Sequence, residues 1–135
     1  MSYFSYKNNI LYCENVKISD IADKYGTPAY IYSKKTLSEN FDTYANAFDK
    51  KSGLICFSVK SLSNLSILKF LSEKGSGFDI VSGGELERTL LAGADPKKII
   101  FTGIAKTDEE ILFGIEKNIL SFNIESKSEM MRIEK

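Results

Sequence analysis

The chain has 135 residues, with 18 basic and 18 acidic side chains and therefore no formal net charge at neutral pH. This length suits one modest domain or a piece of a larger one, and the balanced charge gives no electrostatic case for binding nucleic acid or an anionic membrane. The sequence contains no histidine, which excludes histidine-based catalytic triads and histidine-ligated metals within this chain.

Two further features limit the class of protein. No uninterrupted apolar segment approaches the roughly 20 residues of a membrane span, and the polar N-terminus lacks a signal-peptide core, so we expect a cytoplasmic protein. Cys13 and Cys56 make neither a metal-ligand spacing nor a disulfide framework. We therefore expect no metal site.

The N-terminal residues predict a small hairpin followed by a helix. Apolar runs at residues 3–6 and 9–13 flank a polar turn, which is typical of a hairpin. Residues 18–25 have the apolar spacing of a helix, with Ser19 as a possible cap and Gly26 as a stop.

A long amphipathic helix is expected from Ser33 to Lys51, after an extended stretch at residues 29–32. Apolar side chains recur there at the spacing of one helical face. They are Leu37, Phe41, Tyr44 and Phe48.

The rest of the chain is periodic. Strand-like segments begin at Leu54, Gly77, Lys98 and Leu120, so the steps between them are 23, 21 and 22 residues. Helical stretches lie between them, and the last two helices open with capping-box patterns at residues 107–110 and 126–129. Alternation of this kind predicts βα units and a parallel sheet, and a leucine-rich-repeat solenoid is disfavoured because the segments share no consensus. We predict an α/β fold that forms the first four units of a (β/α)8 barrel, since a full barrel needs about 250 residues.

The first of these strands, at residues 54–60, ends in a lysine. Side chains alternate along a strand, so Lys60 should share a face with Ser58 and Cys56. Two interpretations of Lys60 remain open on this pattern. Its amine either extends from the strand end into water or is desolvated and available to form a Schiff base.

Other polar residues are expected at the same edge of the sheet. By strand alternation Asp79, Asn123 and Glu125 point inward near the carboxyl ends of their strands, as Lys60 does. Each alone could be a solvated strand end, but four convergent polar groups predict a ligand site. The turn at residues 82–84 has two glycines but lacks the spacing of a phosphate-binding fingerprint.

Four segments carry a resemblance to a known family. They are Phe57-Ser-Val-Lys-Ser-Leu-Ser-Asn64, Gly75-Ser-Gly-Phe-Asp-Ile-Val-Ser-Gly-Gly-Glu-Leu86, Lys98-Ile-Ile-Phe-Thr-Gly103 and Phe122-Asn-Ile-Glu-Ser126. The chain resembles the diaminopimelate decarboxylase family, which belongs to the fold-type III pyridoxal-phosphate enzymes. The resemblance implies that Lys60 is catalytic and carries pyridoxal 5'-phosphate as a Schiff base. It also implies that Asp79 orients the cofactor through hydrogen bonds and that Ser58 and Ser82 lie near its ring.

The resemblance further implies how the chain is divided and what completes it. Residues 1–32 would belong to a β-domain, and residues 33–135 would form the N-terminal half of an alanine racemase-like barrel. Relatives act as homodimers and take further site residues from the second half of the barrel and from the partner subunit. We therefore expect the N-terminal third of an enzyme that releases carbon dioxide from meso-2,6-diaminopimelate to give L-lysine, inactive as this chain alone.

Two alternatives remain. One is a decarboxylase of the ornithine, arginine or carboxynorspermidine type, because the residues that select the substrate lie mostly outside this chain. The other is a non-catalytic pyridoxal-phosphate-binding protein or a degenerate fragment that serves only as an interaction module.

Overall fold

The computed structural model describes residues 3–48 and 53–135. The chain divides into two compact units, Met1–Gly53 and Leu54–Lys135. This division differs from the boundary expected after residue 32, because the helix at Lys34–Ala47 groups with the N-terminal unit. The assignment of residues 1–32 to a β-domain stays a prediction.

The N-terminal unit contains the predicted hairpin. Strands β1 (Phe4–Lys7) and β2 (Ile10–Cys13) pair antiparallel, and a short third strand, β3 (Val16–Lys17), extends the sheet in the order β1-β2-β3. The two-residue turn between β1 and β2 consists of Asn8 and Asn9, with φ angles of 50° and 62°. Asparagine tolerates this left-handed conformation, which a tight hairpin turn requires at both positions.

Two helices follow within this unit. Helix α1 (Ile18–Tyr25) ends at Gly26 as predicted, with a φ angle of 81°. The expected cap at Ser19 is wrong, because Lys17 occupies the N-cap position and no side chain caps the helix. Helix α2 (Lys34–Ala47) ends earlier than expected, and the last residues of the predicted helix, 49–51, lie outside the described residues.

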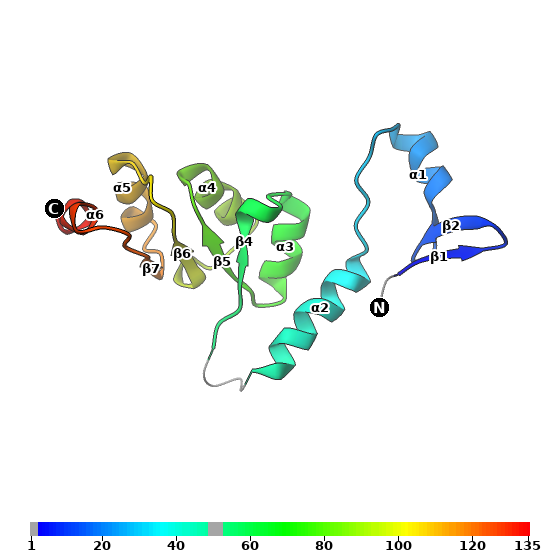
Figure 1. Cartoon of the computed structure of the whole chain (residues 1–135), viewed down its shortest axis with the longest axis horizontal. Helices are drawn as coiled ribbons and strands as arrows, with labels where there is room; N and C mark the ends of the chain where they lie inside the picture. Colours follow the sequence, from blue (N-terminus) through cyan, green and yellow to red (C-terminus); the bar gives the residue numbers. More distant parts are fainter. Residues whose placement is uncertain (1–2, 49–52) are drawn as a thin grey trace. The chain divides into compact units, whose positions relative to one another are not determined.

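The C-terminal unit is a parallel α/β structure, as predicted. Its four strands pair in the order β4-β5-β6-β7, and Figure 1 shows them in succession from green to red with their helices. The strands are β4 (Cys56–Ser58), β5 (Gly77–Ile80), β6 (Ile99–Phe101) and β7 (Ser121–Phe122). The helices are α3 (Leu65–Glu73), α4 (Gly83–Leu91), α5 (Asp108–Glu116) and α6 (Lys127–Glu134), and the 3-10 turns are η1 (Val59–Ser61) and η2 (Pro96–Lys98).

The core of this unit lies on one face of the sheet. Alternate residues of β5 and β6 are completely buried, namely Phe78, Ile80, Ile99 and Phe101. Leu68, Leu86 and Ile111 from the helices are buried as well. The residues between them, such as Asp79, point to the opposite face because side chains alternate along a strand. The helices therefore cover the apolar face and leave the other face to smaller and more polar side chains.

The last strand is tied to this core by aromatic packing. The rings of Phe101 in β6 and Phe122 in β7 stack with their centroids 5.7 Å apart. Gly114 in α5 makes room for this arrangement, because a Cβ at that position would lie 2.6 Å from Cζ of Phe122.

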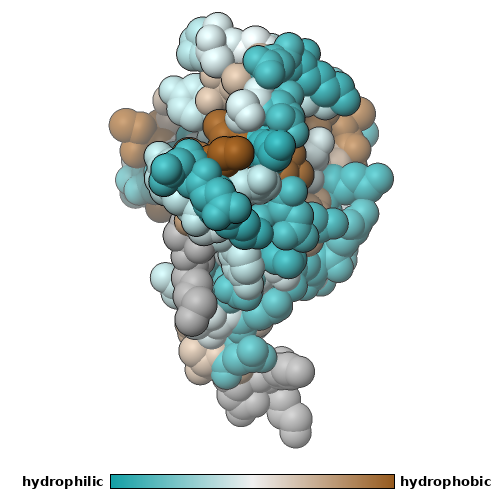
Figure 2. Space-filling model, turned by 90° about the vertical axis from the view of Figure 1, so that its right-hand side faces the viewer, coloured by the Kyte–Doolittle hydropathy of each residue, from teal (hydrophilic) through white to brown (hydrophobic). Residues whose placement is uncertain are grey.

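The face drawn in Figure 2 is predominantly hydrophilic, with hydrophobic residues scattered among polar ones. Within residues 3–48 and 53–135, no helix has both the length and the apolar character needed to cross a bilayer.

Candidate functional site

Lys60 lies at the carboxyl end of β4 but not in the strand. The strand ends at Ser58, and residues Val59–Ser61 form the turn η1. A hydrogen bond of 2.7 Å from Oγ of Ser61 to the carbonyl of Ser58 helps to close this turn. The expectation that Lys60 continues the face of Ser58 and Cys56 is therefore wrong, because strand alternation stops at Ser58. Lys60 is exposed, whereas Val59 before it is completely buried. In this chain Lys60 is therefore not desolvated, which corresponds to the first of the two interpretations that the strand pattern left open.

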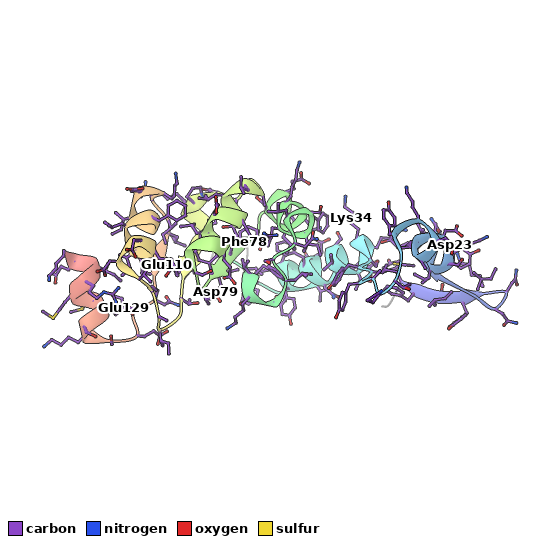
Figure 3. All side chains as sticks on the ribbon, turned by 90° about the horizontal axis from the view of Figure 1, so that it is seen from above. Asp23, Lys34, Phe78, Asp79, Glu110 and Glu129 are labelled. Carbon is purple, nitrogen blue, oxygen red and sulfur yellow. The ribbon has the colours of Figure 1, made fainter. Side chains whose placement is uncertain are left out.

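The carboxylate of Asp79 joins three neighbouring strands. Its Oδ1 accepts a hydrogen bond of 2.8 Å from the hydroxyl of Thr102, and its Oδ2 accepts one of 3.3 Å from the hydroxyl of Ser58. Asp79 is in β5, Ser58 ends β4, and Thr102 follows β6. We call these three residues the Asp79 cluster. Figure 3 labels Asp79 beside its buried neighbour Phe78. Because hydrogen bonds to both oxygens restrain the carboxylate, it is held in one orientation at the carboxyl edge of the sheet.

Thr102 is the member of this cluster that sequence reasoning missed. Asp79 pairs with Ile100 in the sheet, and Thr102 comes two residues later, hence on the same face as Ile100. Its backbone N–H also donates to the carbonyl of Ile80 over 2.8 Å. The signal that could have identified Thr102 is this two-residue spacing, but it requires the register between the strands.

The position of Ser82 is determined by its place at the start of helix α4. It is the N-cap of α4, and its Oγ accepts a hydrogen bond of 3.2 Å from the backbone N–H of Glu85. The structure brings Ser58 and Asp79 into contact, but within the described residues no hydrogen bond links either Lys60 or Ser82 to the Asp79 cluster.

Asn123 and Glu125, expected at the same mouth, are exposed. Their described hydrogen bonds run through the backbone, since the carbonyl of Asn123 accepts from Lys106 and the N–H of Glu125 donates to Glu129. In the part of the chain that the structure describes, neither side chain is bound to Asp79.

The face that carries the Asp79 cluster is lined by small side chains near β4 and β5. Cys56 pairs with Gly77 across these strands. Burial raises the pKa of the Cys56 thiol, and the negative charge of Asp79 raises it further, so this thiol is protonated at neutral pH. A Cβ at Gly77 would lie 2.5 Å from the carbonyl oxygen of Lys98 and 2.8 Å from Sγ of Cys56, so only glycine fits there.

Together these residues define an α/β protein with a candidate site at the carboxyl ends of parallel strands, the edge where such folds bind ligands. An exposed primary amine on one loop and an oriented carboxylate on the next strand suit a carbonyl compound with polar edges. No group of metal-ligating side chains was found in the described ranges, 3–48 and 53–135.

Comparisons with known proteins identify the family. Residues 34–135 match the family described as "Pyridoxal-dependent decarboxylase, pyridoxal binding domain". The chain belongs to this family.

Similarity to individual proteins agrees with this family assignment. The chain is 47% identical over 133 residues to the diaminopimelate decarboxylase of Haemophilus influenzae, covering 98% of this chain and 32% of that protein. It is 48% identical over 125 residues to the diaminopimelate decarboxylase of Neisseria meningitidis serogroup A, covering 93% of this chain and 31% of that protein. The crystal structure of diaminopimelate decarboxylase from M. jannaschii with L-lysine has a TM-score of 0.91 at 36% identity, over 96% of this chain and 31% of that chain. The chain thus spans about a third of the length of the curated relatives that it matches.

Proposed function

We propose that this chain is the lysine-bearing portion of a pyridoxal-phosphate-dependent diaminopimelate decarboxylase, which converts meso-2,6-diaminopimelate to L-lysine and carbon dioxide in lysine biosynthesis. The observation that carries the proposal is the position of Lys60 at the carboxyl end of β4, one strand away from the hydroxyl-bound carboxylate of Asp79. The names of the relatives support the substrate. Since the chain spans about a third of their length, the activity is proposed for a protein in which the rest of the enzyme accompanies it.

The donor set fits the aldehyde and ring of pyridoxal phosphate. A lysine amine is the group that bonds the aldehyde, and within the described residues no hydrogen bond or ion pair engages Lys60. Asp79 offers an oriented carboxylate, and its neighbours Cys56 and Ser58 on the same face of the sheet have small side chains.

The turn at residues 82–84 does not fit the cofactor's phosphate. The backbone N–H of Val81 already donates to Glu85 over 2.8 Å, and that of Gly83 donates to Glu110 over 2.7 Å. Two carboxylates therefore occupy the amides that would have to bind an anion here, and a phosphate would meet like charge.

Bound pyridoxal phosphate supplies an electron sink for the electron pair that departing carbon dioxide leaves on the substrate's α-carbon. Lys60 would hold the cofactor covalently through its side-chain nitrogen. Asp79 would orient the ring by accepting a hydrogen bond at its edge, and the hydroxyls of Ser58 and Thr102 would keep this carboxylate in place. Ser82 would contact the cofactor from the next turn.

The architecture proposed for the whole protein follows the same family. Strands β4 to β7 with their helices would be the first four units of a (β/α)8 barrel, which their parallel order supports. Residues 33–135 would then belong to the barrel and residues 1–32 to a β-domain. We also propose a cytoplasmic homodimer.

Borohydride trapping tests the role of Lys60. The chain is incubated with pyridoxal phosphate, reduced and mapped by peptide mass spectrometry. We expect the label at Lys60 to exceed the label at Lys69, an exposed lysine of α3 that serves as an internal control for non-specific reaction. The Lys60→Arg variant should lose the excess. Equal labelling of both lysines in the wild type would refute the assignment.

A chimera tests the activity and the substrate. The chain replaces the matching segment of the Haemophilus influenzae enzyme, and carbon dioxide release is measured with meso-2,6-diaminopimelate, ornithine and arginine. We expect release from diaminopimelate only, and none when Lys60 is changed to alanine. Release from ornithine or arginine would support the first alternative, and an inactive chimera that binds the cofactor would support a non-catalytic role.

A further inference from the structure

Three helices of the C-terminal unit begin in the same way. Each has a hydroxyl residue at its N-cap and a glutamate three residues later: Ser82 and Glu85 in α4, Thr107 and Glu110 in α5, Ser126 and Glu129 in α6. We call Glu85, Glu110 and Glu129 the capping glutamates. One oxygen of each accepts a hydrogen bond from a backbone N–H at the start of its own helix, from Val81, Thr107 and Glu125 respectively.

In two of the three, the second oxygen reaches back to the preceding strand–helix loop. Oε1 of Glu110 accepts a hydrogen bond of 2.7 Å from the backbone N–H of Gly83, 27 residues earlier. Oε1 of Glu129 accepts one of 2.9 Å from the amine of Lys106, 23 residues earlier. The second bond of Glu110 is not needed to cap α5, because its other oxygen already accepts from the N–H of the N-cap residue Thr107.

Two arginines, each three residues after a capping glutamate, also donate hydrogen bonds to earlier loops. Nε of Arg88 in α4 donates to the carbonyl of Ser63 over 2.9 Å, and Nη2 of Arg132 in α6 donates to the carbonyl of Lys106 over 2.8 Å. The loops before α3, α4 and α5 are thus each held by a side chain from the helix of the next unit.

The Glu110 bond acts on the turn that contains a candidate site residue. Gly83 is the first residue of α4, so its N–H has no acceptor within the helix. A Cβ at Gly83 would lie 3.1 Å from Cγ of Glu110, and glycine therefore allows the carboxylate to approach closely. The carboxylate also lies at the N-terminus of α4, where the helix dipole favours negative charge.

We propose that Glu110 is a positioning residue, which holds the Ser82–Gly84 turn through the Gly83 amide and so sets where the Ser82 hydroxyl lies relative to Asp79. The importance of Ser82 rests on the proposed function, but the hold on the turn does not. Figure 3 labels Glu110 at the start of α5 and Asp79 in β5, on separate elements. Glu110 therefore acts on the site through the backbone and touches no reacting group.

Glu110 is ionised at neutral pH. Burial raises the pKa of its carboxyl, but the hydrogen bonds from Gly83 and Thr107 outweigh burial and leave the pKa below its ordinary value. The acceptor that Gly83 meets is therefore an anion, and hydrogen bonds to charged groups are among the stronger ones in proteins.

Amide hydrogen exchange of the whole chain without cofactor, followed by NMR, tests the hold directly. Glu110→Ala removes the acceptor, and Glu110→Asp keeps the charge but shortens the side chain. We expect exchange of the Gly83 amide to become at least about tenfold faster in both variants, with shifted amide signals of Ser82. Glu109→Ala, at an exposed neighbour in the same helical turn, is the matched control and should leave Gly83 unchanged.

Exchange at Gly83 that stays at the wild-type rate in both Glu110 variants would overturn the proposal, as would equal acceleration in Glu109→Ala.

A second experiment compares borohydride labelling of the wild type and these variants at limiting pyridoxal phosphate. Weaker labelling of Lys60 in the Glu110 variants, with wild-type labelling in Glu109→Ala, supports the positioning role. Undiminished labelling in the Glu110 variants would show that Glu110 only caps its helix and does not position the site. Absence of labelling at Lys60 both in the wild-type chain and in the chimera would instead refute the proposed function, and the exchange result would still decide whether Glu110 holds the turn.

Discussion

The amine of Lys106 and the carboxylate of Glu129 lie 2.9 Å apart, and their side chains are 0% and 6% exposed. Lys106 also donates to the carbonyls of Gly103 and Asn123, so all three of its donors are used. This ion pair joins the loop after β6 to the start of α6. A buried charge that is fully paired and hydrogen-bonded is tolerated, but loss of one partner leaves the other uncompensated.

Removal of the Glu129 carboxylate should therefore lower the stability of the folded chain markedly. We expect Glu129→Ala to lower the free energy of unfolding by about 3 kcal/mol, measured by urea denaturation. The matched control is Asp108→Ala, which removes the ion pair between Asp108 and Arg132, whose side chains are 75% and 41% exposed. That change should cost less than about 1 kcal/mol, and equal losses in the two variants would contradict a special role for the buried pair.

The same carboxylate predicts a pH dependence. The backbone N–H of Glu125 and the amine of Lys106 lower the pKa of Glu129 below its ordinary value of 4.5. A group with a lowered pKa in the folded state contributes stability that is complete above the unfolded pKa and is lost as the pH falls through the folded pKa. We expect the difference in unfolding free energy between the wild type and Glu129→Gln to be constant above about pH 5 and to shrink at lower pH. A difference that stays constant down to about pH 3 would show that Glu129 is not the group responsible.

Gly77 should not accept a side chain. The nearest atom to a Cβ there would be the backbone oxygen of Lys98 at 2.5 Å, and backbone atoms of a paired sheet cannot move cheaply. We expect Gly77→Ala to lower the free energy of unfolding by about 2 kcal/mol. Gly84→Ala is the control, since a Cβ at that helical position would meet only Oγ of Ser82 at 3.9 Å. It should be neutral or stabilising, by up to about 1 kcal/mol, and a larger loss there than at Gly77 would contradict the packing described.

Thr102→Val tests the Asp79 cluster with little change of volume. It removes the hydroxyl that donates to Oδ1 of Asp79 over 2.8 Å, and we expect a loss of about 2 kcal/mol in unfolding free energy because the acceptor is a carboxylate. Ser121→Ala, at an exposed position of β7, should change stability by less than about 0.5 kcal/mol. If Asp79→Ala removes the difference in unfolding free energy between wild type and Thr102→Val, the two residues are coupled, and additive effects would argue against the bond.

Much of the fold could be predicted because it depends on local patterns. β5 begins at the predicted Gly77, since a glycine with positive φ at position 75 ends α3 immediately before a buried apolar run. The capping box of α5 was also predicted and is present in full. The pattern at residues 126–129 is present only in part, because Glu129 turns to the N–H of Glu125 instead of that of Ser126.

The site could be predicted only in part, because its details depend on three-dimensional register. Val59 is apolar, so the sequence pattern predicts a strand that continues to Lys60. In the structure the strand ends at Ser58, and a hydrogen bond from Ser61 to Ser58 closes the turn that follows. Thr102 meets Asp79 through strand pairing, and Lys106 meets Glu129 across 23 residues and two loops. The repeat of about 22 residues places such positions on neighbouring units, but it does not determine which side chains meet.

The ion pair between Glu129 and Lys106, in the loop before α5, affects where this fold can be divided into fragments. A fragment that stopped after β7 would keep every strand of the unit, yet it would leave the ammonium of Lys106 inside the protein without its counter-charge. Trimming α6 would then be expected to dislodge the loop that precedes α5, at some distance from the cut. Fragment boundaries in this fold are therefore best placed one helix beyond the last loop that has to be preserved.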